Sequence, residues 1–194
     1  MVEVYNRNIG HIEDGARYHQ TRQGGDIHTD SVNRPEPMRY LVMACAEPAL
    51  AGGESILIRA RDLLDRLRPY PEVIDTLSQP FYFEGRGMAA NPALFQMPVL
   101  TQTGNGPVFR YLRPYIASAH DRAGTPLGRD QLYAFDMLDT FLESSALQHR
   151  LSLRQGDILV TDDTRVFHDR TSFVDKPRAG AWTKGRCILR YWVE

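Results

Sequence analysis

Cysteine is scarce in this sequence, because its 194 residues include only Cys45 and Cys187. Both thiols lie inside apolar runs, LVMACAEPAL and RCILRYWV, where a free cysteine behaves as a small buried hydrophobic residue. So few cysteines argue against a disulfide-stapled scaffold and against a cysteine-rich zinc site.

Long apolar runs and an excess of either charge are also lacking. No stretch approaches the ~20 apolar residues that a membrane-spanning helix needs, and the start MVEVYNRNIG lacks the apolar segment of a signal peptide. The formal net charge is −1, with basic and acidic residues interleaved, which offers no electrostatic footprint for nucleic acid or an anionic membrane. We therefore expect a cytoplasmic protein whose partner is a small molecule.

No repeat, low-complexity tract or linker divides the chain, so a single domain over residues 1–194 is predicted. One amphipathic helix is expected in 129–147, where Leu132, Phe135, Leu138 and Leu142 share a face and Asp130 is available as the N-cap. A second helix is expected in 60–69, ending at Pro69. Strands are predicted where β-branched and aromatic residues gather: 39–46, 54–59, 81–85, 98–103, 107–112, 151–155, 157–163 and 185–194.

Many strands and few helices indicate a mainly β fold, a sandwich or jelly roll with the helices packed outside one sheet. Such a fold encloses a concave interior in which side chains from distant strands can meet.

The stretch GGDIHTDS places His28 and Asp30 two residues apart, so an extended backbone projects both side chains from one face. His168 follows the strand-like run DILVTDDTRVF and could join them through tertiary folding. Two imidazoles and one carboxylate are the set that holds non-haem Fe(II) with open coordination positions. The segment HIED offers a rival pair, His11 and Glu13, because glutamate also supplies a carboxylate. A pattern of two residues is short and occurs easily by chance.

Arg186 and Arg190 are an even number of residues apart in GRCILRYWV, so strand alternation puts them on one face with Ile188 and Trp192. A guanidinium that turns into an apolar interior requires an anion, ideally a carboxylate. This pattern predicts a bound acid.

The segments GGDIHTDS, AGGES, GDILVTDDTRVFHDRTSF and GRCILRYWV together resemble the Fe(II)/2-oxoglutarate-dependent oxygenases of the taurine dioxygenase and clavaminate synthase-like superfamily. The resemblance spans nearly the whole chain and implies a double-stranded β-helix with flanking helices. It implies that His28, Asp30 and His168 ligate the iron, and the distance to GGES favours His28 and Asp30 over His11 and Glu13.

The same resemblance implies 2-oxoglutarate and O2 as co-substrates. Ser55 and Arg190 would hold the distal carboxylate of 2-oxoglutarate, with Arg186 as the companion arginine. The implied reaction releases succinate and CO2 and hydroxylates an unactivated C–H bond of a small molecule, an amino acid or a specialised metabolite. The carboxylate of Asp30 favours this oxidation over halogenation, because halogenating relatives carry a small residue there.

Two features depart from the family pattern. Asp163 stands where relatives often have asparagine, so an amide near the metal has become an acid. Only 27 residues precede His28, fewer than relatives usually have. Either the core is unusually compact, or a second copy of the chain or a second subunit covers the part of the domain that the longer N-terminal segment covers in relatives.

The substrate pocket is less well marked. Arg110 and Arg113 in FRYLRPYI are three apart, so at most one points inward from a strand. An inward Arg110 would bind a substrate carboxylate, and the competing interpretation is an ion pair that stabilises the fold. The segment at 83–98, FEGRGMAANPALFQMP, is either a lid or an ordinary connection.

Two further functions fit the same residues. One is a cupin-like metal enzyme that does not use 2-oxoglutarate, because jelly rolls carry many chemistries. The other is a non-catalytic jelly-roll accessory subunit. An effect of Arg190 on 2-oxoglutarate use would exclude the first, and 2-oxoglutarate chelation at a bound metal would exclude the second.

Overall fold

The computed structural model describes residues 1–7, 20–30, 32–85, 93–175 and 185–194. Its strands are β1 Val2–Val4, β2 Tyr40–Glu47, β3 Ala51–Gly52, β4 Ser55–Arg59, β5 Pro80–Glu84, β6 Leu94–Pro98, β7 Leu100–Thr103, β8 Gly106–Phe109, β9 His149–Leu151, β10 Ile158–Asp162, β11 Val166–Arg170, β12 Phe173–Val174 and β13 Cys187–Val193. Its helices are α1 Ala60–Leu67, α2 Pro71–Leu77, α3 Arg113–Arg122, α4 Arg129–Leu142 and the short 3-10 helix η3 Ser145–Leu147.

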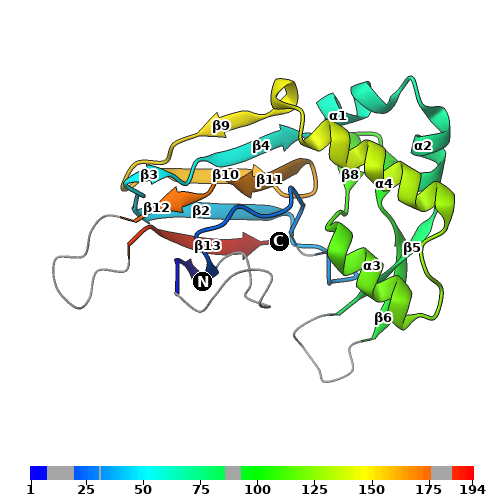
Figure 1. Ribbon diagram of the computed structural model, residues 1–194, viewed down its shortest axis with the longest axis horizontal. Helices are drawn as coiled ribbons and strands as arrows, with labels where there is room; N and C mark the ends of the chain where they lie inside the picture. The colour runs from blue at the N-terminus through cyan, green and yellow to red at the C-terminus, as the bar shows by residue number, and fades with distance from the viewer. Residues whose placement is uncertain (8–19, 31, 86–92, 176–184) are drawn as a thin grey trace.

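Two antiparallel sheets carry the β part of the fold. One has four strands in the order β1-β13-β2-β10, and the other has three in the order β11-β4-β9. The first and last strands of the chain are neighbours, because β1 pairs with β13 (Figure 1). Crossovers of this kind bring distant parts of the sequence together.

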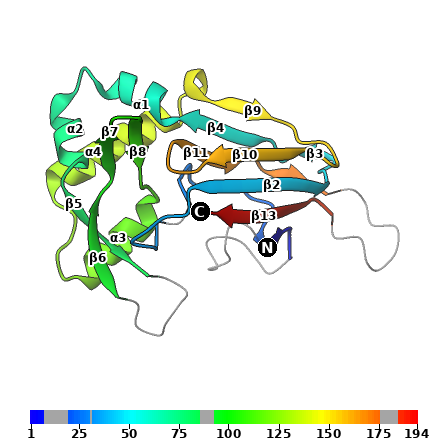
Figure 2. The ribbon, with the colours of Figure 1, turned by 180° about the vertical axis from the view of Figure 1, so that it is seen from behind.

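The helices gather at one end of the sheets, together with the hairpins β5–β6 and β7–β8 (Figures 1 and 2). The expectation that they pack outside one sheet is therefore wrong. Among the described residues, no helix is both long enough and apolar enough to cross a bilayer.

The strongest predicted helix differs from the structure at its first turn. The N-cap of α4 is Gly128, and Asp130 lies inside the first turn, where a carboxylate complements the helix dipole. The buried face carries Phe135, Leu138 and Leu142, whereas Leu132 is 41% exposed. The helical period was therefore correct, but its first apolar position faces water.

The strand predicted at 151–155 is also misplaced. The strand β9 ends at Leu151, and the chain then turns at residues 154–157, where Asp157 and Arg154 exchange two hydrogen bonds of 2.8 and 3.0 Å. Gly156 adopts a φ of 90° in this turn, a backbone conformation that favours glycine. The turn leads directly into β10.

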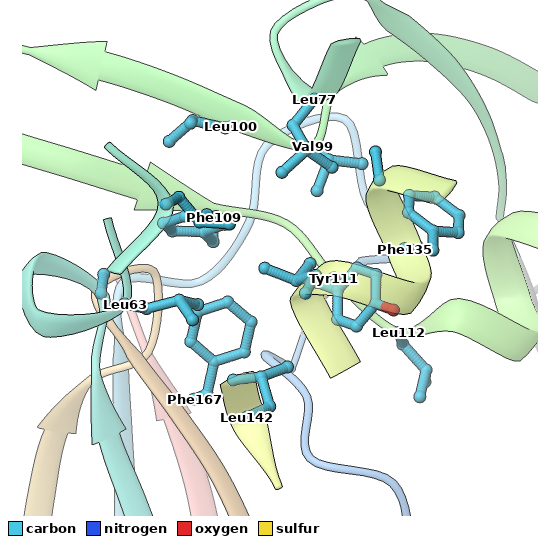
Figure 3. Packing of buried hydrophobic residues seen from close by; sticks show 14 of the residues in the cluster. Leu63, Leu77, Val99, Leu100, Phe109, Tyr111, Leu112, Phe135, Leu142 and Phe167 are labelled. Carbon is cyan, nitrogen blue, oxygen red and sulfur yellow. The ribbon is translucent and has the colours of Figure 1, made fainter. Parts of the chain in front are cut away.

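A hydrophobic core of aliphatic and aromatic side chains connects the helices with the sheets (Figure 3). Phe135 on α4 stacks on Phe81, with 5.2 Å between ring centroids, and Phe109 meets Phe167 at 5.1 Å. Phe167 is fully buried and immediately precedes His168 on β11. Because side chains alternate along a strand, anchoring Phe167 in this core turns His168 to the other face.

A candidate metal centre

The main chains of the two predicted imidazole ligands pair directly. His28 donates its N–H to the carbonyl of His168 at 3.1 Å, and His168 donates to the carbonyl of His28 at 2.8 Å. The two rings lie with centroids 4.6 Å apart. A single antiparallel bridge therefore fixes the segment around His28 against β11.

The carboxylate of Asp30 completes the group. Its Oδ1 is 3.4 Å from Nε2 of His28, and its Oδ2 is 3.9 Å from Nε2 of His168. The three candidate ligand atoms all lie within 4.8 Å of one another. The structure thus brings together the three residues predicted as ligands, whereas the rival pair His11 and Glu13 lies outside the described residues.

The donor set fits a divalent metal of the iron type. Nδ1 of His28 lies 2.7 Å from the carbonyl oxygen of Asp26, which favours the proton on Nδ1 and leaves the Nε2 lone pair directed toward Asp30. Two imidazole nitrogens and one carboxylate on one side leave the opposite positions open for other ligands.

The electrostatics keep the carboxylate ionised. Burial alone would raise the pKa of Asp30, but the hydrogen bond with His28 and the charges of His168 and Arg190 outweigh it and hold that pKa far below its ordinary value. Burial alone would lower the pKa of His28, yet its hydrogen bond and Coulomb attraction to Asp30 raise it overall. An anionic oxygen is thus already present where a cation would bind.

Two residues of β13 also contact Asp30. Trp192 donates its Nε1–H to Oδ2 at 2.9 Å, and Nη1 of Arg190 lies 3.4 Å from the same oxygen. The guanidinium of Arg190 stacks over the ring of Trp192, 4.4 Å from the centroid. The sequence did not assign Trp192 to the site, although its even spacing from Arg190 was the available signal.

Arg186 lies apart from Asp30, just before β13. It is 5% exposed, and its Nη2 donates to the carbonyl of Gly53 at 3.2 Å. Its guanidinium lies 5.4 Å from the ring centroid of Phe173, and that of Arg170 lies 4.8 Å from the same centroid. Burial and, to a smaller extent, the charge of Arg186 lower the pKa of Arg170 to about 10. The guanidinium of half-buried Arg170 also donates to the carbonyls of Thr21 and Arg22, at 3.0 and 3.3 Å.

Arg186 also lines a cavity of about 230 Å³ with Cys45, Gly53 and Ile188. Ser55 is 4% exposed and lies opposite Arg170 in the pairing of β4 with β11. Arg170 is a residue that the sequence analysis missed, although its place two positions after His168 puts it on the same strand face.

A second cavity, of about 280 Å³, borders Asp30. It is lined by Asp30, Pro35, Glu36, Pro37, Met97, Pro98, Thr101, Thr103, Val108, Phe109, Arg110 and Thr164. The wall is therefore mainly apolar, with Glu36 contributing an exposed carboxylate. A small organic molecule suits such a space beside a metal.

Arg110 lines this second cavity but is already engaged. Its guanidinium donates to the carbonyls of Arg34 and Pro35, the latter at 2.9 Å, and lies 5.5 Å from the ring centroid of Phe83. Arg113 begins α3 and pairs with Asp139, so the expectation that both arginines lie on one strand is wrong.

The segment predicted as a lid or connection belongs in part to the hairpin of β5 and β6, and residues 86–92 lie outside the described part.

The model of the taurine catabolism dioxygenase TauD, TfdA family matches residues 3–192. The chain belongs to this family. The match confirms the resemblance inferred from the sequence.

Solved structures support the fold of this TauD/TfdA family member. Asparagine oxygenase superposes with a TM-score of 0.73 and 17% identity, covering 98% of this chain and 54% of that chain. The non-haem iron oxygenase OrfP with bound Fe superposes with a TM-score of 0.69 and 19% identity, covering 100% of this chain and 56% of that chain. The fold is thus the double-stranded β-helix, and the chain spans about half the length of these structures.

Proposed function

We propose that this TauD/TfdA family chain is an Fe(II)- and 2-oxoglutarate-dependent oxygenase that acts on a small amino-acid-like molecule. The observation that carries the proposal is the convergence of His28, Asp30 and His168 on one point in a member of this family. Similar structures contain the corresponding groups: asparagine oxygenase with Fe(II), 3-hydroxyasparagine and succinate, and OrfP with Fe and alpha-ketoglutaric acid.

In this proposal His28, Asp30 and His168 hold Fe(II), which supplies the oxidative chemistry when 2-oxoglutarate and O2 are present. The protein contributes the placement of the ligands, the burial of the site and the binding of both organic molecules. The products would be succinate, CO2 and a hydroxylated substrate.

The geometry favours Arg186, rather than Arg190, for the distal carboxylate of 2-oxoglutarate. This acid chelates a metal through its keto acid end, so its other carboxylate lies away from the metal ligands. Arg190 contacts Asp30, whereas Arg186, four residues earlier and beyond the register shift at the start of β13, contacts the carbonyl of Gly53 instead. Arg186 is buried beside its own cavity. We therefore propose Arg186 and Ser55 for this carboxylate, with Arg170 as the second cation.

Arg190 is then available for the substrate. Its Nη1 contacts Asp30, and its Nε is buried with no hydrogen-bond partner among the described residues. We propose that the guanidinium turns to take a substrate carboxylate as the partner that its Nε lacks. Glu36 offers a negative charge in the cavity that borders Asp30, suited to an amino group. These opposite charges support an amino acid as the substrate class.

One titration tests the proposal. Under anaerobic conditions, Fe(II) and 2-oxoglutarate added to the protein should produce the weak visible charge-transfer band of the chelate. Admission of O2 should then yield succinate, with a mass gain in the true substrate. A folded protein that binds Fe(II) without the band would favour the cupin-like alternative, and one that binds no Fe(II) would favour the accessory subunit.

A further inference from the structure

A fully buried carboxylate lies behind the metal ligands. Asp163 follows β10 and is 0% exposed. Its main-chain N–H donates to the carbonyl of Arg39 at 2.8 Å, which ties it to the start of β2. A buried acid is unfavourable unless its oxygens are engaged, so its contacts identify its role.

One oxygen of Asp163 faces two of the proposed ligands. Its Oδ1 accepts the main-chain N–H of Asp30 at 3.1 Å and lies 3.4 Å from Nδ1 of His168. Through a single atom, Asp163 thus touches the backbone of one ligand and the ring of another.

The two imidazoles differ in what faces their Nδ1 atoms. The Nδ1 of His28 is held by the main-chain carbonyl of Asp26 at 2.7 Å. The Nδ1 of His168 is buried and makes no well-formed hydrogen bond among the described residues, and Asp163 is the acceptor beside it. An acceptor here favours the proton on Nδ1 and directs the Nε2 lone pair to a metal.

The other oxygen argues against a purely stabilising role. Oδ2 of Asp163 is buried without a hydrogen-bond partner among the described residues. An orphaned oxygen of this kind destabilises a fold, and an apolar side chain of the same shape would avoid the loss. The contacts of Oδ1 with the ligands offset it.

We propose that Asp163 is a positioning residue for the metal centre, which holds the main chain of Asp30 and the ring tautomer of His168. The inference rests on the ligand set of the proposed function. It assigns a role to a buried acid that is not one of the proposed ligands.

Two readouts without O2, 2-oxoglutarate or substrate test this role. The first is Co(II) affinity, measured by visible absorption. Asp163→Ala should weaken it by about 10- to 100-fold, the usual effect of losing a partner of a metal-bound histidine. Asp163→Asn keeps the shape and one acceptor oxygen, so its loss should be smaller, about 3- to 10-fold.

The second readout is the tautomer of His168 in the metal-free protein, from the 15N shifts of its ring at alkaline pH. The wild type and Asp163→Asn should carry the proton on Nδ1, whereas Asp163→Ala should populate both tautomers. Asp162→Ala is the matched control, because the neighbouring Asp162 pairs with Arg39 at 3.5 Å and Arg165 at 3.4 Å instead.

Unchanged Co(II) affinity and tautomer in folded Asp163→Ala would overturn the inference. If Asp163→Ala does not fold, Asp163→Asn decides, and an affinity within twofold of the wild type would overturn it. A wild type that binds no Co(II) would refute the proposed function, while the tautomer measurement would still decide the role of Asp163.

Discussion

At the scale of single residues, the site depends on His28, Asp30 and His168, whose candidate ligand atoms lie within 4.8 Å of one another. Asp30 is ionised and lies between two imidazoles, an indole N–H and a guanidinium. These groups stabilise the carboxylate in the absence of metal, and a divalent cation would compete with them for the same oxygens.

Removal of a ligand should therefore abolish metal-linked stabilisation. We expect His168→Ala and Asp30→Ala to weaken Fe(II) or Co(II) affinity by at least about 100-fold, more than the loss of a supporting residue. Thermal unfolding with and without metal measures this. His149→Ala is the control, because His149 is exposed on β9. Wild-type metal stabilisation in either ligand variant would contradict the assignment.

Substitutions of Arg186 and Arg190 should affect different KM values. Arg186→Gln should raise the KM for 2-oxoglutarate by about 10- to 100-fold, because a hydrogen bond to a charged group contributes roughly 1.5–3 kcal/mol. Arg190→Gln should mainly raise the KM for the substrate. Succinate formation at varied concentrations of each compound measures both, and the opposite pattern would restore the assignment made from the sequence.

At the scale of elements, His28 and Asp30 are held by a connection, whereas His168 lies on the regular strand β11. Thr29 lies between His28 and Asp30 and is 1% exposed. Its N–H donates to the carbonyl of Tyr111 at 2.9 Å, and its Oγ1 accepts the N–H of Tyr111 at 3.0 Å. Tyr111 in turn donates its hydroxyl to Asp139 of α4 at 2.5 Å. The ligand segment is thus tied to the helical end of the molecule.

Thr29→Val should reveal this coupling, because it removes the acceptor of a buried N–H and keeps the shape. The expected loss in free energy of unfolding is about 1–3 kcal/mol, with weaker metal binding. Thr29→Ser keeps the hydroxyl and should lose less, about 0.5–1.5 kcal/mol for the missing methyl group. An unchanged free energy of unfolding for Thr29→Val in urea would show that the hydroxyl contributes nothing.

At the scale of the whole molecule, the four-stranded sheet is apolar on both faces. Tyr191, Val42 and Val160 lie side by side across β13, β2 and β10 on the face opposite Arg190. Val160 is 58% exposed and Tyr191 is 44% exposed. A sheet with one solvated face usually alternates apolar and polar residues, so this pattern is typical of a sheet covered on both sides.

Val160→Lys tests whether this outer face is open to solvent in the isolated chain. We expect the free energy of unfolding to change by less than about 0.5 kcal/mol, and the binding of the dye ANS and aggregation to decrease. Val174→Lys is the control, because Val174 is 53% exposed on β12, outside this sheet. A large destabilisation by Val160→Lys would mean that another layer covers the face.

The homo-oligomer or second subunit expected from the sequence stays a prediction, which sedimentation can test.

The sequence by itself determined the ligand types, the strand-rich composition and the helical period of α4. These are local properties, because residue type and spacing set which side chains share a face. They were enough to place His28, Asp30 and His168 in one hypothesis, and the resemblance of four sequence segments to a known family indicated the family.

Only the tertiary structure decided which groups meet. Asp163 behind His168, Arg190 at Asp30 and Arg186 beside Gly53 depend on strand order and register. A slip of one residue would turn every side chain of a strand to the opposite face, and hydrogen bonds between distant strands fix the register. Spacing along the chain does not reveal those hydrogen bonds. The sequence therefore suggested that Arg110 binds a ligand, whereas its guanidinium donates to backbone carbonyls in the structure.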